Sequence, residues 1–181
     1  MNKRKTTDSL SSLEPKKSFP SFDLLSHPSS PPLSLHLATE SAEQTEEAGA
    51  LLAAYLRYHA SSPRYIALTG DLGVGKTAFV RGFTKILAPG AAVRSPTFAL
   101  VNEYYPVDPT LPPVFHFDMY RITSEEDLYS IGYDDYLDRG FCLVEWSENI
   151  PYALPEHYWK VGIAKSSPLL PNNRLITFDI V

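Results

Sequence analysis

"YIALTGDLGVGKTAFVRGF" (residues 65–83) contains the strand, loop and helix that decide the fold of this chain. An apolar run typical of a buried strand enters a loop with three glycines, and a helical pattern follows from Lys76 to Leu87. Residues 70–77 match G-x-x-x-x-G-K-[ST], the pattern of a phosphate-binding loop. Glycines let the backbone wrap closely around a phosphate, and the helix presents its positive N-terminal end to the anion. The stretch therefore predicts a site for the phosphates of a nucleotide.

Two residues at the end of this loop have the chemistry that such a site needs. Lys76 supplies a mobile positive charge for the outer phosphates, and the hydroxyl of Thr77 can bind Mg²⁺. The loop alone does not identify the base. A guanine-specific GTPase usually carries N-K-x-D, and the chain has no such tetrapeptide. We therefore expect ATP and Mg²⁺ as the ligands.

The remaining chain reads as alternating strands and helices. A strand at 33–39 precedes a helix at 41–59, which Ser41 and Gln44 begin with capping-box spacing. Strands at 97–105 and 113–120 flank a proline-rich connector, which favours a hairpin. Thr123 and Glu126 open one or two short helices, 141–146 reads as a central strand, and two strands close the chain. We predict an α/β fold similar to that of P-loop NTPases, a single domain at 33–181 with a mixed sheet and helices on both faces.

Two carboxylates stand at the ends of predicted buried strands, where a phosphate site needs them. Asp118 ends "VFHFD" and Glu145 ends "CLVE", and either could help to hold Mg²⁺ or activate water. Asp118 could instead cap a turn, and Glu145 could instead pair with Arg121. His116 shares a strand face with Asp118 and has a structural or a catalytic role.

The segments next to these carboxylates have open interpretations. Ser95 and Thr97 lie in "RSPTF" between the helix and the hairpin, where a nucleotide switch can sense a phosphate, although a plain loop explains the segment equally well. Trp146 follows Glu145 and is either a packing anchor or a stacking platform beside the nucleotide.

Composition bounds the class of protein. The chain has 181 residues, of which 44 % are hydrophobic and 20 % charged, and its net charge of −5 argues against one broad basic face for nucleic acid. The single cysteine, Cys142, lies in an apolar run and favours a reducing compartment, so we expect a cytoplasmic protein without a membrane span. Residues 1–32 hold eight serines and five prolines and read as a flexible tail, with a basic organelle address as the alternative.

Together, "GDLGVGKTAFVRGF", "SPTFALVNEY", "HFDMYR", "IGYDDYL" and "LVEW" resemble the TsaE family over residues 33–181. That family comprises the P-loop ATPases of tRNA threonylcarbamoyladenosine synthesis. The resemblance implies that Thr77 and Glu145 approach the metal, that Asp118 and Glu145 are the candidate catalytic carboxylates, and that Trp146 is functionally sensitive. It also implies that residues 39–41, before the first helix, approach the adenine. Arg174 sits at a comparable place before the last strand. The implied nucleotide-binding residues are Gly73, Val74, Gly75, Lys76, Thr77, Ala78, Thr97 and Asp118.

The resemblance further implies a weak ATPase that serves a complex. Its partners are the TsaD and TsaB proteins, which transfer a threonylcarbamoyl group to the adenosine next to the anticodon of tRNAs that read codons beginning with A. This chain would then drive or reset that complex, and it would contact tRNA only through its partners. Two alternatives stay open: a stand-alone small-molecule kinase, and a nucleotide-gated binding module that does not turn over.

Overall fold

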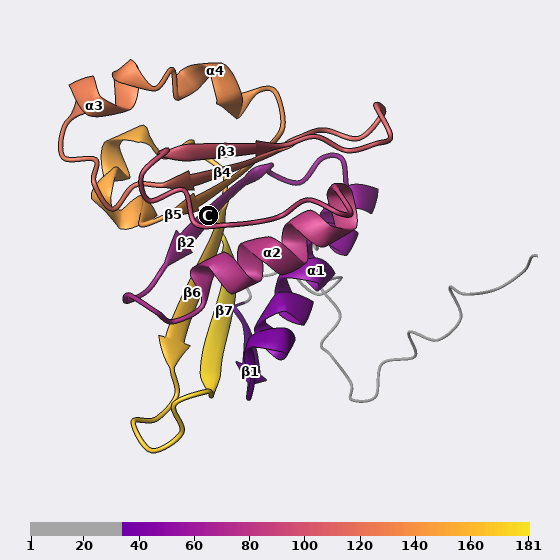
Figure 1. Ribbon diagram of the computed structural model, residues 1–181, viewed down its shortest axis with the longest axis vertical. Helices are drawn as coiled ribbons and strands as arrows, with labels where there is room; N and C mark the ends of the chain where they lie inside the picture. Colours follow the sequence, from indigo (N-terminus) through magenta and orange to yellow (C-terminus); the bar gives the residue numbers. More distant parts are fainter. Residues whose placement is uncertain (1–33) are drawn as a thin grey trace, which may run out of the picture.

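The computed structural model describes residues 34–181, which form one seven-stranded sheet in the order β1-β7-β6-β2-β5-β4-β3 (Figure 1). β6, β2, β5 and β4 run parallel to one another, whereas β3 pairs antiparallel with β4, β7 with β6, and β1 with β7. The predicted mixed α/β sheet is therefore confirmed. The strands are β1 (Leu35–Thr39), β2 (Tyr65–Thr69), β3 (Val101–Tyr104), β4 (Val114–Asp118), β5 (Phe141–Glu145), β6 (Trp159–Lys165) and β7 (Arg174–Ile180).

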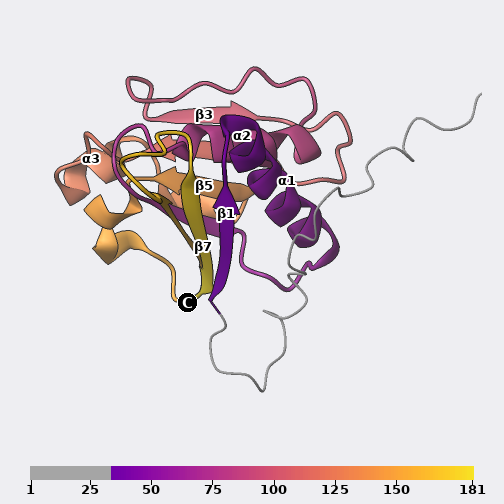
Figure 2. The ribbon, with the colours of Figure 1, turned by 90° about the horizontal axis from the view of Figure 1, so that it is seen from below.

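Helices α1 (Ala42–Tyr58) and α2 (Lys76–Leu87) cover one face of the sheet, side by side (Figures 1 and 2). α1 begins at the predicted cap, since the Ser41 hydroxyl accepts a hydrogen bond from the backbone N–H of Gln44 at 3.3 Å. The two helices approach closely because Gly49 on α1 and Gly82 on α2 leave no side chain between their backbones. Their apolar stripes join the inner residues of the sheet in one core, with Phe79, Phe83 and Trp159 among its largest members.

The opposite face carries shorter elements: α3 (Glu125–Ser130), α4 (Asp134–Leu137) and the 3₁₀ turns η2 (Ser147–Asn149) and η3 (Pro151–Ala153). They enclose a second core around Phe115, Phe117 and Tyr133. Within this core the Tyr65 and Tyr133 hydroxyls form a hydrogen bond of 2.6 Å. Cys142 is also buried here, as the sequence predicts, and burial raises the pKa of its thiol to about 12.

β5 lies in the middle of the parallel strands, between β2 and β4, and each of its residues is buried. The prediction of a central strand is therefore confirmed. The parallel strands β2, β4 and β5 have their carboxyl ends at one edge, and the register places Asp118 directly beside Glu145. This edge brings both predicted carboxylates to the loop that follows β2.

Two predicted boundaries are wrong. Residues 97–100 form a turn instead of the start of a strand, because the N–H of Leu100 donates to the carbonyl of Pro96 and Leu100 has a φ of 64°. α3 is capped by Ser124 instead of Thr123. The Ser124 hydroxyl accepts from the N–H of Asp127, while the Thr123 hydroxyl donates to the Asp127 carboxylate.

The predicted tail at 1–32 lies outside the described residues. Among residues 34–181, each helix is too short or too polar to cross a bilayer.

Candidate functional site

The glycine-rich loop, residues 70–75, joins β2 to α2 at the carboxyl edge of the parallel strands. Gly70, Gly73 and Gly75 have φ values of 133°, 73° and 110°, in the left-handed region that other residues rarely adopt. A Cβ at Gly70 would also overlap the carbonyl oxygen of Ile163 on β6. The glycines that the sequence singles out are therefore required by the conformation of the loop.

The N-terminus of α2 is left without a side-chain cap. Gly75 occupies the capping position and offers no side chain, in contrast to Ser41 on α1. The first N–H groups of a helix need partners from outside the helix. At α2 these donors and the positive end of the helix dipole can serve an anion instead.

The Lys76 ammonium lies against its own loop. Nζ donates to the carbonyl oxygens of Gly70 and Asp71 at 2.5 and 3.0 Å and lies 3.8 Å from the centre of the Trp146 ring. Partial burial lowers the pKa of Lys76, and nearby carboxylates, Glu145 foremost, oppose that shift. Neutral carbonyls are weak partners for an ammonium, so an incoming phosphate can displace them.

Thr77, in the first turn of α2, reaches the end of β5. Its hydroxyl donates to Glu145 Oε1 at 2.8 Å, and His116 Nε2 lies 2.8 Å from the same oxygen. Glu145 is 4 % exposed and does not form the alternative ion pair with Arg121, whose guanidinium lies over the Phe98 ring. The two predicted metal-binding residues thus meet directly.

Asp118 holds the segment that precedes β3. Its Oδ2 accepts from the hydroxyls of Thr97 at 2.8 Å and Ser95 at 3.2 Å, and these two hydroxyls lie 2.7 Å apart. Its Oδ1 accepts from the N–H of Tyr120 at 3.0 Å, so the alternative role as a turn cap is also present. A ligand that competes for Asp118 would release Ser95 and Thr97, which is the arrangement that a switch segment needs.

Trp146 covers the site from the end of β5. Its backbone has a φ of 59°, which is uncommon for a large residue, and its ring contacts both the Lys76 ammonium and the Tyr120 ring, whose centre lies 5.0 Å away. It also packs partly against the second core. Packing anchor and stacking platform are therefore compatible at this residue.

The remaining residues implied by the resemblance surround the far side of the loop. Arg174 Nε donates to the carbonyl oxygen of Val74 at 2.7 Å, and Ala78 lies in the first turn of α2. The hydroxyls of Thr39 and Thr45 lie 3.1 Å apart, and Thr45 packs 3.5 Å from the position of a Cβ on Gly75. Sequence reasoning missed Thr45, since its place one turn after Ser41 carries no signal that it faces the loop.

The donor set fits magnesium with a nucleotide better than a metal held by protein alone. Among residues 34–181, no three His, Cys, Asp or Glu side chains come together as a metal centre. Mg²⁺ usually takes one or two protein ligands and completes its shell with phosphates and water. Thr77 with Glu145 or Asp118 meets that requirement.

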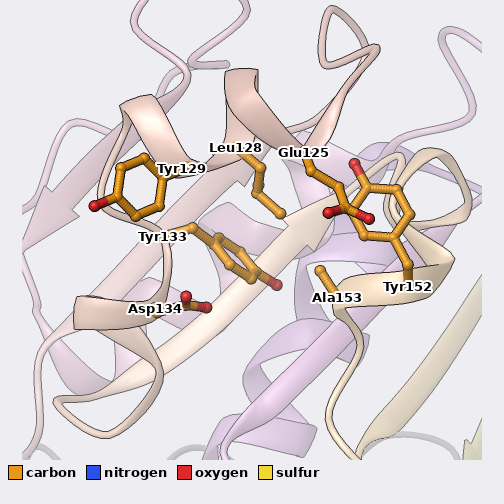
Figure 3. A pocket seen from close by; sticks show the side chains of 7 residues that line it. All are labelled: Glu125, Leu128, Tyr129, Tyr133, Asp134, Tyr152 and Ala153. Atoms are coloured by element: carbon orange, nitrogen blue, oxygen red, sulfur yellow. The ribbon is translucent and has the colours of Figure 1, made fainter.

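A separate pocket of about 330 Å³ lies on the opposite face of the sheet (Figure 3). It is lined by Glu125, Leu128, Tyr129, Tyr133, Asp134, Tyr152 and Ala153. Two carboxylates and no basic side chain surround it, so it would repel phosphate. By charge, this pocket suits an anion less well than the glycine-rich loop does.

Comparisons with known proteins identify relatives of this chain. The family model described as "Threonylcarbamoyl adenosine biosynthesis protein TsaE" matches residues 39–174. The chain is 35 % identical over 144 residues to a Bacillus subtilis protein named tRNA threonylcarbamoyladenosine biosynthesis protein TsaE, covering 79 % of this chain and 84 % of that protein. A Haemophilus influenzae protein of the same name is 38 % identical over 102 residues, 56 % of this chain and 63 % of its own.

A solved structure shows the same fold. The crystal structure of Bacillus subtilis YdiB superposes with a TM-score of 0.63 at 31 % identity, covering 84 % of this chain and 89 % of YdiB. The part of this chain that the family model matches includes the glycine-rich loop, Asp118 and Glu145. This chain therefore belongs to the TsaE family.

Proposed function

We propose that this chain binds ATP with Mg²⁺ at the glycine-rich loop and hydrolyses it in the service of tRNA threonylcarbamoyladenosine synthesis. The observation that carries the proposal is the meeting of Lys76, Thr77 and Glu145 at one edge of the sheet, in a member of the TsaE family. The names of its relatives supply the tRNA modification, and the loop chemistry supplies the nucleotide.

Each residue at this edge has a role that its contacts support. The N–H groups of residues 73–78 bind the phosphates, and the Lys76 ammonium leaves the Gly70 and Asp71 carbonyls to pair with them. Thr77 binds the metal, and Glu145 or Asp118 orients the attacking water. Bound Mg²⁺ would supply positive charge to offset the negative charge of the phosphates.

We propose that the ATPase acts with partner proteins of the TsaD and TsaB type instead of transferring the threonylcarbamoyl group itself. The net charge of −5 supports this division of labour, since tRNA would then be held mainly by the partners. The single buried cysteine is compatible with work in the reducing cytoplasm.

A reconstituted assay tests the proposal. Phosphate release from Mg-ATP is measured for the chain alone and with purified TsaD and TsaB, and tRNA modification is measured in the same mixture. Lys76→Ala and Thr77→Ala should each abolish both activities while the melting temperature is retained. Lys85→Ala, an exposed lysine on the same helix, is the matched control and should behave as wild type.

Other outcomes identify the alternatives. Phosphate transferred to a small acceptor indicates a kinase, and tight ATP binding without turnover under any condition indicates a nucleotide-gated binding module. Full activity of Lys76→Ala would refute the site. In cells, depletion of the protein should remove threonylcarbamoyladenosine from tRNA, and wild type but not Lys76→Ala should restore it.

A further inference from the structure

His116 lies beneath the proposed nucleotide site, in the layer between the sheet and α2. It sits in the middle of β4 and is 0 % exposed. Its neighbour two residues earlier, Val114, belongs to the core that Phe79 and Phe83 of α2 also form. Alternation along a strand therefore puts the imidazole on the face that α2 covers, together with Asp118.

The ring makes one polar contact within the described residues. Nε2 lies 2.8 Å from Glu145 Oε1, while Nδ1 is buried without a hydrogen-bond partner. Because an ionised carboxylate oxygen can only accept, the tautomer that forms this hydrogen bond carries its hydrogen on Nε2 and donates. The contact with Glu145 is thus the one contact that offsets the burial of a polar ring.

The two donors to Glu145 belong to separate elements of the fold. Thr77 comes from α2 and His116 from β4, and both converge on Oε1. Glu145 Oε2 accepts no hydrogen bond from residues 34–181. The carboxylate is therefore fixed through one oxygen, and its other oxygen is left for a cation or a water molecule.

We infer that His116 is a positioning residue: its Nε2–H fixes the Glu145 carboxylate so that Oε2 is presented to the metal or to the attacking water. This inference rests on the proposed function for the identity of the ligand. A residue that only fills space needs no polar atom, and Val114, the neighbour of His116 on the same face of β4, is apolar. The imidazole at this position instead uses its one N–H donor to bind Glu145.

Four variants separate positioning from filling. His116→Phe keeps a ring but removes the donor, and His116→Gln carries an amide N–H the same number of bonds from the backbone as Nε2. Glu145→Gln removes the acceptor charge, and the double variant His116→Phe/Glu145→Gln completes a cycle. Each is measured for kcat and KM with the partner proteins, for ATP affinity with and without Mg²⁺, and for its urea unfolding midpoint.

We expect His116→Phe to lower the same quantity that Glu145→Gln lowers, either kcat or the Mg²⁺-dependent part of ATP affinity, by about 10- to 100-fold. His116→Gln should recover most of that loss. In the Glu145→Gln background, His116→Phe should have no further effect, because the residues act as a unit. His116→Phe should leave ATP affinity without Mg²⁺ unchanged.

Three results would overturn the inference: wild-type values for His116→Phe, a full additional loss in the Glu145→Gln background, or a folded His116→Gln as impaired as His116→Phe. If His116→Phe does not fold, His116→Asn replaces it, since its shorter amide cannot reach Glu145.

Failure of the proposed function has a different signature. If the wild-type chain shows no turnover, the double-mutant cycle at positions 116 and 145 is evaluated from the Mg²⁺-dependent part of ATP affinity. If the wild type binds no ATP, the proposed function fails, while the urea midpoints of the nucleotide-free variants still test the contact. Additive midpoints at positions 116 and 145 would then refute it.

Discussion

Gly82→Ala tests whether the close approach of α1 and α2 sets the position of the nucleotide site. Alanine is favoured over glycine inside a helix by about 1 kcal/mol, so propensity alone predicts a more stable protein. The structure predicts the opposite. An added Cβ would overlap the carbonyl oxygen of Glu46 on α1 and lie 2.7 Å from Glu46 Cα.

The expected loss follows from those contacts. Carbon atoms pack best about 3.5–4.0 Å apart, so relief of the contact with Glu46 Cα alone requires the two backbones to separate by about 1 Å. Overpacking of this kind costs about 1–3 kcal/mol, and a clash with backbone belongs at the upper end because no side chain can rotate away. After the propensity gain, Gly82→Ala should lose about 2 kcal/mol, or roughly 4–8 °C in melting temperature for a domain of this size.

Thermal unfolding measured by circular dichroism provides the assay, and an exposed position on the same helix provides the control. Lys85→Ala should be more stable than Lys85→Gly by about 1 kcal/mol, which measures propensity without a clash. Because α2 begins with Lys76 and Thr77, Gly82→Ala should also weaken ATP binding. A rise in melting temperature equal to the Lys85 difference would refute the reasoning.

Two further predictions concern the contact of Arg174 with the glycine-rich loop and the buried pair Tyr65 and Tyr133. Arg174→Ala should weaken ATP binding by about tenfold without unfolding the protein, because Arg174 Nε restrains the loop at the Val74 carbonyl; calorimetric titration measures it, and unchanged affinity would contradict this role. Burial raises the pKa of Tyr65 and Tyr133 above 10.0, so both stay protonated in the folded state while the unfolded chain ionises. Their contribution to stability is present below pH 10 and is lost as the pH rises above that value. Above pH 10 the free energy of unfolding should therefore fall less steeply with pH in the Tyr65→Phe/Tyr133→Phe double variant than in the wild type.

Sequence patterns predicted best what depends on neighbours in the chain. The glycines of the loop, the helix that starts at Lys76 and the cap at Ser41 all follow from backbone conformation or from periodicity over a few residues. The errors occurred where two local signals compete. Thr123 and Ser124 are both good caps, and a turn closed by the Pro96 carbonyl replaces the first part of the extended structure that the pattern "TFALVNEYY" favours.

The contacts within the site could not be predicted in the same way. The approach of Trp146 to Lys76, the bond from Ser95 and Thr97 to Asp118, and the place of Thr45 depend on how separate elements pack. Side-chain patterns report which face of an element is buried, but they do not report which residue lies opposite.

By itself, the sequence determined a strand, a glycine-rich loop and a helix with a lysine and a threonine at its start, and it placed two carboxylates at strand ends. Only the tertiary structure decided that β5 lies between β2 and β4, so that Glu145 meets Thr77 from 68 residues away and His116 from 29. The physical reason is that backbone conformation and amphipathic period are local properties. Strand order is settled by long-range pairing and by the packing of α2 on the sheet.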